Sequence, residues 1–247
     1  MNQIKYDINQ NYFSKISGFP FCYWMKSKTF DVFNNPSIES VASCCKGLDT
    51  CDNDTFVRGW YEVEYHNIGF NISDTSNTFS YKWFPYCKGG DYRKWYGNFE
   101  KVVLWQNDGE ILRNLRDSNG KIKSRPQNIR YYFKPGLTFN SISSSYRAIR
   151  YMNNCIFGGG GSGLFSNNED MIYHLCCFIN SKVSKTMFDY LNPGLNFLVG
   201  DLLRIPYCES ENDEENIIKF SNSNIEISRL DWDSFETSWD FKKHPLI

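Results

Sequence analysis

The sequence has no long apolar run, and this excludes a membrane-spanning helix. Its 247 residues are 41% hydrophobic, yet no stretch approaches the roughly 20 apolar residues that a helix needs to cross a bilayer. The first ten residues are polar and lack the apolar core of a signal peptide. We therefore predict no membrane contact. The length suits one large domain or two small ones.

The sequence also lacks the patterns of common metal, thiol and catalytic sites. Its nine cysteines are an odd number and include no C-x-x-C spacing, which favours reduced thiols and a cytoplasmic protein. The three histidines, His66, His174 and His244, are far apart and without partners at ligand spacing. Because no acid–base pair stands out either, we expect no metal site and no catalytic residue in this chain.

Charge is unevenly distributed, although the net charge of the whole chain is only −1. Residues 80–150 hold 14 Lys and Arg against 5 Asp and Glu, a local charge of +9. Residues 208–247 hold 10 acids against 4 bases, a local charge of −6. The basic middle indicates a polyanion surface, and the acidic end indicates a segment that packs on its own protein.

The basic middle is interleaved with aromatic residues between Tyr81 and Asn98. Lys and Arg neutralise phosphates, a Gly pair lets the backbone approach one, and Tyr or Trp can stack on bases. The alternative is a half-buried hairpin whose aromatics are core.

The order of elements predicts an α+β fold with short, mostly antiparallel strands. Strands are expected at 56–63, 101–105, 131–133 and 150–157. A helix with apolar residues at helical spacing is expected near 168–191, and Asn180-Ser181 could divide it. The run Gly158–Gly163 fits G-x-G-x-x-G, but the acid expected about 20 residues further on is missing. A flexible loop or an engineered linker is favoured there over a nucleotide site.

Seven short segments of the sequence carry a resemblance to a known family through their residues, order and spacing. They are Gly47–Arg58, Lys82–Tyr86, Lys88–Asn98, Tyr132–Thr138, Asn180–Val183, Leu191–Asp201 and Asp231–Phe241. Over residues 40–247 they resemble the region after the catalytic domain in PglX-type adenine-specific DNA methyltransferases of BREX phage-defence systems. Related strings occur in restriction–modification enzymes. In that family the first string usually has a Gly where this chain has Cys51, so Cys51 is strained if the turn needs a positive φ.

The resemblance implies a target recognition domain that reads double-stranded DNA. It also implies an upstream methyltransferase domain that uses S-adenosylmethionine and clamps a flipped adenine. The Pro-Pro pair of that clamp is absent here, so we expect a piece of a longer protein that binds no cofactor and methylates nothing by itself. We expect residues 1–207 to form the recognition domain and residues 208–247 to be an acidic, aromatic extension that packs on it or on an absent neighbour.

The candidate DNA contacts are the basic, aromatic and glycine residues of these strings: Arg58, Lys82, Trp83, Tyr86, Lys88, Gly89, Gly90, Arg93, Lys94, Trp95, Tyr96, Lys134 and Arg147. The alternative function is an aromatic-rich module that binds carbohydrate or protein, without any role on DNA.

Overall fold

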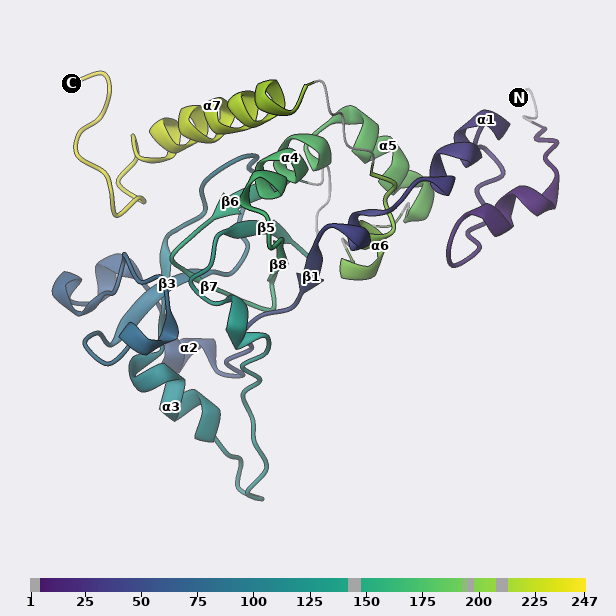
Figure 1. Cartoon of the computed structure of the whole chain (residues 1–247). Coiled ribbons are helices and arrows are strands. Elements are labelled where there is room, and N and C mark those ends of the chain that lie inside the picture. Colours follow the sequence, from purple (N-terminus) through teal and green to yellow (C-terminus); the bar gives the residue numbers. More distant parts are fainter. Residues whose placement is uncertain (1–4, 142–147, 193, 195–197, 208–212) are drawn as a thin grey trace.

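The computed structural model of the chain describes residues 5–141, 148–192, 194, 198–207 and 213–247. Two four-stranded sheets form the body (Figure 1). The first sheet has the order β1-β8-β5-β6 and is antiparallel throughout. The second has the order β2-β4-β3-β7, and only its β3–β7 pair is parallel. The strands are β1 Ser43–Cys45, β2 Val57–Gly59, β3 Trp83–Cys87, β4 Lys101–Leu104, β5 Gly136–Asn140, β6 Ile149–Met152, β7 Ile156–Phe157 and β8 Gly161–Phe165.

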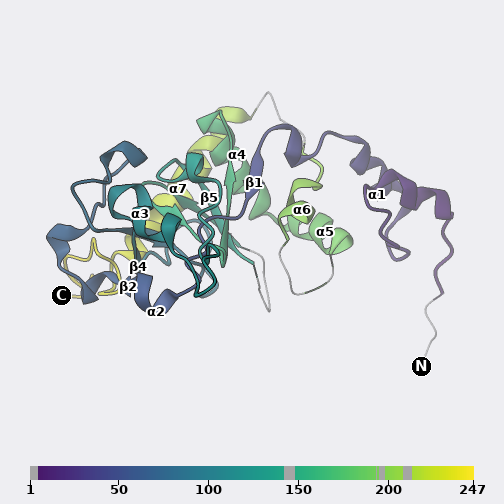
Figure 2. The ribbon, with the colours of Figure 1, turned by 90° about the horizontal axis from the view of Figure 1, so that it is seen from below.

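Helices α4 and α7 lie on the side of the first sheet, whereas α2 and α3 lie beside the second (Figure 1). α4 lies across β5 and β6, and α7 runs along α4 on its outer side (Figure 1). The N-terminal segment with α1 extends away from the body beyond α5 and α6 (Figure 2). The α-helices are α1 Ser27–Phe30, α2 Asn53–Phe56, α3 Gln106–Asn114, α4 Glu169–Ile179, α5 Lys182–Leu191, α6 Val199–Leu203 and α7 Glu214–Trp232. Helices and short, mostly antiparallel strands confirm the predicted α+β class. Within the described residues, every helix is too short or too polar to span a bilayer.

Two apolar clusters form the core, one for each sheet. The first joins the β1-β8-β5-β6 sheet to α4–α7 through residues such as Leu175 and Phe188. The second fills the space around the other sheet and includes Phe84, Trp105 and Phe157. The strands β7 and β8 follow each other in the chain but belong to different sheets, so the glycine run between them links the two halves of the body.

The glycine run is neither a flexible linker nor a nucleotide loop, because Gly158 and residues 161–163 are buried at the junction of the sheets and only Gly159 and Gly160 are exposed. Gly161–Phe165 is strand β8, hydrogen-bonded to β1 and β5. A methyl group on Gly158 would lie 2.2 Å from the Tyr86 hydroxyl oxygen. Glycine is required at position 158 because the Tyr86 side chain lies too close for a larger residue. The short sequence motif does not reveal this contact.

The predicted helix near 168–191 is two helices. The Asn180 side chain ends α4, where its Nδ2 donates to the carbonyls of Ile149 (3.0 Å) and Cys176 (3.0 Å). The Ser181 hydroxyl then caps α5 by accepting a hydrogen bond from the Ser184 amide (3.2 Å). The division considered at Asn180-Ser181 is therefore the observed one.

Other local predictions had mixed outcomes. Strand β4 confirms the strand expected at 101–105, whereas the strand expected at 131–133 was wrong. Tyr132 and Phe133 are both buried in a turn, with Phe133 at a φ of 65°, so they do not alternate as strand residues do. Helix α7 was not predicted. Its contact face uses Ser221, Ile225 and Trp232, while several apolar residues of the helix are exposed, which hides the usual periodicity.

Candidate nucleic-acid interface

The segment Lys88–Asn98, called the basic loop below, begins at a glycine pair that takes positive φ values. Gly89 and Gly90 have φ of 101° and 130°, a region that side chains disfavour. Beneath the loop lies Arg150, which is only 2% exposed. Its guanidinium donates to the Asn140 amide oxygen (2.8 Å) and to the Arg93 carbonyl (3.4 Å), and Asn140 in turn donates to the Gly90 carbonyl. A buried cation thus fixes the path of the basic loop.

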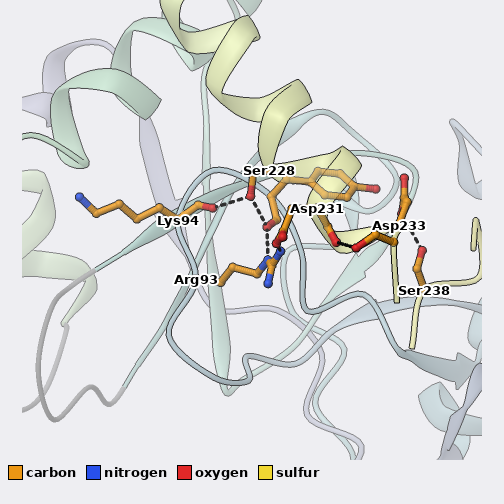
Figure 3. A network of polar contacts seen from close by, with 8 residues as sticks. Arg93, Lys94, Ser228, Asp231, Asp233 and Ser238 are labelled. Carbon is orange, nitrogen blue, oxygen red and sulfur yellow. Dashed lines mark hydrogen bonds and ion pairs between the residues drawn. The ribbon is translucent and has the colours of Figure 1, made fainter. Parts of the chain in front are cut away.

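Arg93 does not point freely into solvent, because helix α7 holds it. Its Nε donates to the Tyr96 carbonyl (3.0 Å), its terminal nitrogen pairs with the Asp231 carboxylate, and its guanidinium lies 5.2 Å from the centre of the Trp232 ring. Figure 3 shows Asp231 and Ser228 facing Arg93 and Lys94. The Ser228 hydroxyl is within 3.0 Å of both the Lys94 and Tyr96 carbonyls.

Three further residues of the basic loop, Lys94, Trp95 and Tyr96, are also held by contacts within the chain. Lys94 donates through Nζ to the Asn180 carbonyl (2.9 Å), at the junction of α4 and α5. Trp95 has a φ of 70° and pairs through its backbone with Ile149 (3.0 Å) and Tyr151 (2.7 Å). Arg229 of α7 lies 4.8 Å above the Tyr96 ring. Helix α7 therefore contacts Arg93, Tyr96 and the carbonyl of Lys94, in addition to its packing on α4.

Tyr86 must be removed from the candidates for base contact. It is 2% exposed, and its hydroxyl donates to the Leu48 carbonyl (2.8 Å). Burial also raises the pKa of the phenol well above its usual range. Tyr86 is a core residue, because β3 lies between β4 and β7 and residues 84–87 of it are all buried. Trp83 is half-buried, with the exposed Lys82 ammonium 5.9 Å from the centre of its ring.

Two further candidates are held close to their own loops. Arg58 donates to the carbonyls of Asp54 and Val57, the latter at 2.8 Å. Lys134 donates to the Ser73 carbonyl (3.1 Å) and lies 3.7 Å from the Asp74 carboxylate. Arg147 falls outside the described residues. Arg58, Lys82, Trp83 and Lys134 stay predictions as DNA contacts.

A different group of cations converges where the two sheets meet. Lys46, Lys88 and Arg125, called the cationic shelf below, line an open cavity of about 330 Å³ together with the backbone of Gly159 and Gly160. Among the described residues, none of the three cations forms an ion pair. Partial burial, and then the charge of nearby Lys101, lower the pKa of Lys88. The carboxylates of Asp54 and Asp49 act in the opposite direction and raise it by less, so burial is the main cause of the shift.

The backbone under the cationic shelf is fixed by pairs of hydrogen bonds. Asp49 and Arg125 exchange amide–carbonyl bonds of 3.0 and 2.8 Å. Leu48 donates to the Phe157 carbonyl (2.8 Å) and accepts from the Gly159 amide (3.0 Å). Cys51 closes the turn with a φ of 63°, which is the condition under which we expected strain at this position.

Lys46 and Arg125 were not among the sequence candidates. The sequence has a feature that could have marked each of them as a candidate. Lys46 directly precedes the turn-rich segment that begins at Gly47, and Arg125 belongs to the basic middle. Neither feature says that the two residues line one cavity, because they are 79 positions apart in the sequence. In the described part of the chain, no cluster of three or more His, Cys, Asp or Glu residues could hold a metal ion.

Comparisons with known proteins give a match over nearly the whole chain. The chain is 32% identical over 246 residues to the adenine-specific methyltransferase PglX of Lacticaseibacillus casei (strain Zhang), which covers 98% of the chain and 20% of that protein. It is 37% identical over 243 residues to the adenine-specific methyltransferase BrxX of Escherichia coli O9:H4 (strain HS), covering 96% of the chain and 19% of that protein. No protein-family model matches. The chain thus spans about a fifth of the length of these relatives, and it is related in sequence to a partial region of the PglX-type adenine-specific methyltransferases.

Proposed function

We propose that this chain is the DNA-recognition part of an N6-adenine-specific DNA methyltransferase of a phage-defence or restriction–modification system. In this proposal the chain positions double-stranded DNA for a catalytic domain elsewhere in the protein. Residues 1–207 form the recognition unit and residues 208–247 the extension that packs on it. The observation that carries the proposal is the cationic shelf, since Lys46, Lys88 and Arg125 surround a cavity and lack ion pairs in the described structure.

The shelf has the chemistry of a phosphate-binding surface. Lys and Arg contribute positive charge, and the small Gly159 and Gly160 allow the backbone of a strand to come close. Arg125 is exposed and can form two parallel bonds to one phosphate or guanine edge. The half-buried Lys88 is less mobile than a surface lysine, so less entropy is lost when it binds.

The proposal gives no cofactor to this chain. What supports this is that residues 161–165 of the glycine-rich run form strand β8, so the run is not the strand-to-helix loop of a dinucleotide site. S-adenosylmethionine, which the whole enzyme would use, is therefore assigned to the part of the protein outside the chain. The alternative of a carbohydrate-binding module receives less support, because Trp95 and Tyr96 are half-buried against the first core cluster and Arg229 of α7 lies over the Tyr96 ring.

A duplex-DNA titration at about 50 and 200 mM salt tests the proposal, because each phosphate contact contributes about 0.9 to the slope of log K against log salt. The double variant Lys88→Ala, Arg125→Ala is expected to lower that slope by about 2 and to weaken binding to all duplexes. The control Lys26→Ala, Lys28→Ala removes two exposed lysines of the N-terminal segment and leaves the slope unchanged. Equal slopes for the two double variants would reject the shelf as the DNA surface.

A further inference from the structure

A second cavity lies between α7 and the β6–β7 turn, and it shares no residue with the cationic shelf. Its volume is about 540 Å³, within the range of small-molecule sites. Four segments that are distant in the sequence enclose it: the loop at Tyr65–Asn71, the turn at Asn153–Asn154, residues 222–229 of α7, and Trp239–Asp240. We call it the aromatic cavity.

Aromatic rings enter this cavity from two separate groups. Tyr151 and Tyr173 are nearly parallel, with ring centres 5.7 Å apart and planes inclined by 13°. Trp239 lies 5.2 Å from Phe70 and 6.1 Å from Phe99, inclined by 47° to each. Aromatic rings that line a cavity offer stacking surfaces to a flat, aromatic ligand.

Carboxamides provide the polar part of the lining. Asn71, Asn153, Asn154 and Asn222 all face the cavity. No hydrogen bond ties the side chain of Asn71 or Asn222 to the described residues, whereas Asn153 accepts one from the Asn154 amide (2.8 Å). A carboxamide offers a donor and an acceptor side by side, the same pair that reads the edge of adenine.

The charges of the lining disfavour a phosphate. The charged residues of the lining are two acids, Glu226 and Asp240, and one base, Arg229. Arg229 is already committed, since it lies 3.2 Å from the Glu226 carboxylate and 4.8 Å from the centre of the Tyr96 ring. The cavity therefore carries a net negative charge, and a ligand without a phosphate fits it best.

We propose that the aromatic cavity binds an uncharged, planar heterocycle of the nucleobase type, supplied either as a free nucleoside or as an unpaired base of a strand. Rings would stack on its faces, and the carboxamides would bond to its edge. This inference does not rest on the cationic shelf or on the proposed function, because the two cavities have no residue in common.

Titration calorimetry of the full chain with adenosine and with adenosine monophosphate tests the proposal. Adenosine is expected to bind, and the monophosphate to bind several-fold more weakly because of the cavity charge. Tyr65→Ala removes a 58% exposed ring at the cavity and should weaken adenosine binding at least about fivefold. Tyr61→Ala is the matched control, since Tyr61 is 63% exposed and also contacts Trp60 but does not line the cavity.

A second titration separates the two sources of the base. A single strand with 2-aminopurine in place of one adenine reports by fluorescence whether a strand base enters the cavity. A response that Tyr65→Ala lowers and Tyr61→Ala does not would assign the site to an unpaired base. A response to nucleoside alone would assign it to a small molecule. The proposal is overturned if neither probe binds, if the two tyrosine variants behave alike, or if a disaccharide displaces adenosine.

The outcome is separable from that of the DNA proposal. The Lys88→Ala, Arg125→Ala variant should leave nucleoside binding unchanged, because both residues lie outside the aromatic cavity. Thermal unfolding of each tyrosine variant shows whether it is folded. If Tyr65→Ala fails to fold, Asn222→Ala with the control Asn216→Ala on the same helix repeats the comparison, since only Asn222 lines the cavity.

Discussion

Arg93 was a candidate DNA contact, but the structure makes it the residue that attaches α7 to the basic loop, and substitution can decide between the two roles. Arg93→Ala removes three contacts at once. The bond to the Tyr96 carbonyl contributes about 1 kcal/mol, and the stacking on Trp232 about 0.5–1 kcal/mol. The ion pair with Asp231 contributes about 0.5 kcal/mol, because the Asp231 side chain is 59% exposed and water screens it.

These terms predict that Arg93→Ala lowers the free energy of unfolding by about 2 kcal/mol. In a chain of this length that corresponds to a melting temperature about 4–8 °C lower. Asp231→Asn should cost only about 0.5 kcal/mol, since Arg93 keeps its other two contacts. Urea denaturation of both single variants and the double variant gives the coupling energy of the pair, expected at about 0.5 kcal/mol.

Duplex binding at two salt concentrations supplies the second measurement. If Arg93 attaches α7 and does not touch DNA, Arg93→Ala leaves the salt slope unchanged while stability falls. The opposite pattern, a slope reduced by about 0.9 with unchanged stability, would refute this assignment and return Arg93 to the DNA contacts.

Three further predictions concern turns and close packing. Cys51→Gly should stabilise the chain by about 0.5–1 kcal/mol in urea denaturation, because Cys51 has a φ of 63°, whereas Cys51→Ala should not. Gly158→Ala should destabilise it by about 2 kcal/mol through the clash with Tyr86, while Gly159→Ala, with open space around it, should be tolerated. Hydrogen bonds from the first turn of α2 lower the pKa of Asp52 below 3.8, so its stabilising effect is present above that pH and is lost as the pH falls through the lowered pKa. Acid titrations of stability should therefore be flatter for Asp52→Ala, and an unchanged curve would contradict the assignment.

The sequence was informative wherever the decisive interaction is local. The strand at 101–105 and the break at Asn180-Ser181 follow from residues within a few positions of each other. The sequence also indicated that Cys51 would be strained if its turn took a positive φ, and the turn does so.

The sequence was misleading wherever burial depends on distant neighbours. Tyr86 and the glycines near Gly158 have the composition of a ligand-binding stretch, yet they pack against each other at the junction of the two sheets. Helix α7 escaped prediction because its contact face is made partly of serines: Ser221 is fully buried, and Ser228 bonds to the carbonyls of Lys94 and Tyr96.

The sequence by itself determined the fold class, the basic middle, the absence of familiar catalytic motifs and the relationship to a region of PglX-type proteins. These follow from composition, local periodicity and the order of strings along the chain. Only the tertiary structure decided which Lys and Arg side chains of the described residues form ion pairs and which do not. It joined Arg93 to Asp231 across 138 positions and brought Lys46 beside Lys88 and Arg125. Charge is a property of each residue, but whether that charge is neutralised depends on which distant residue the fold places within a few ångströms.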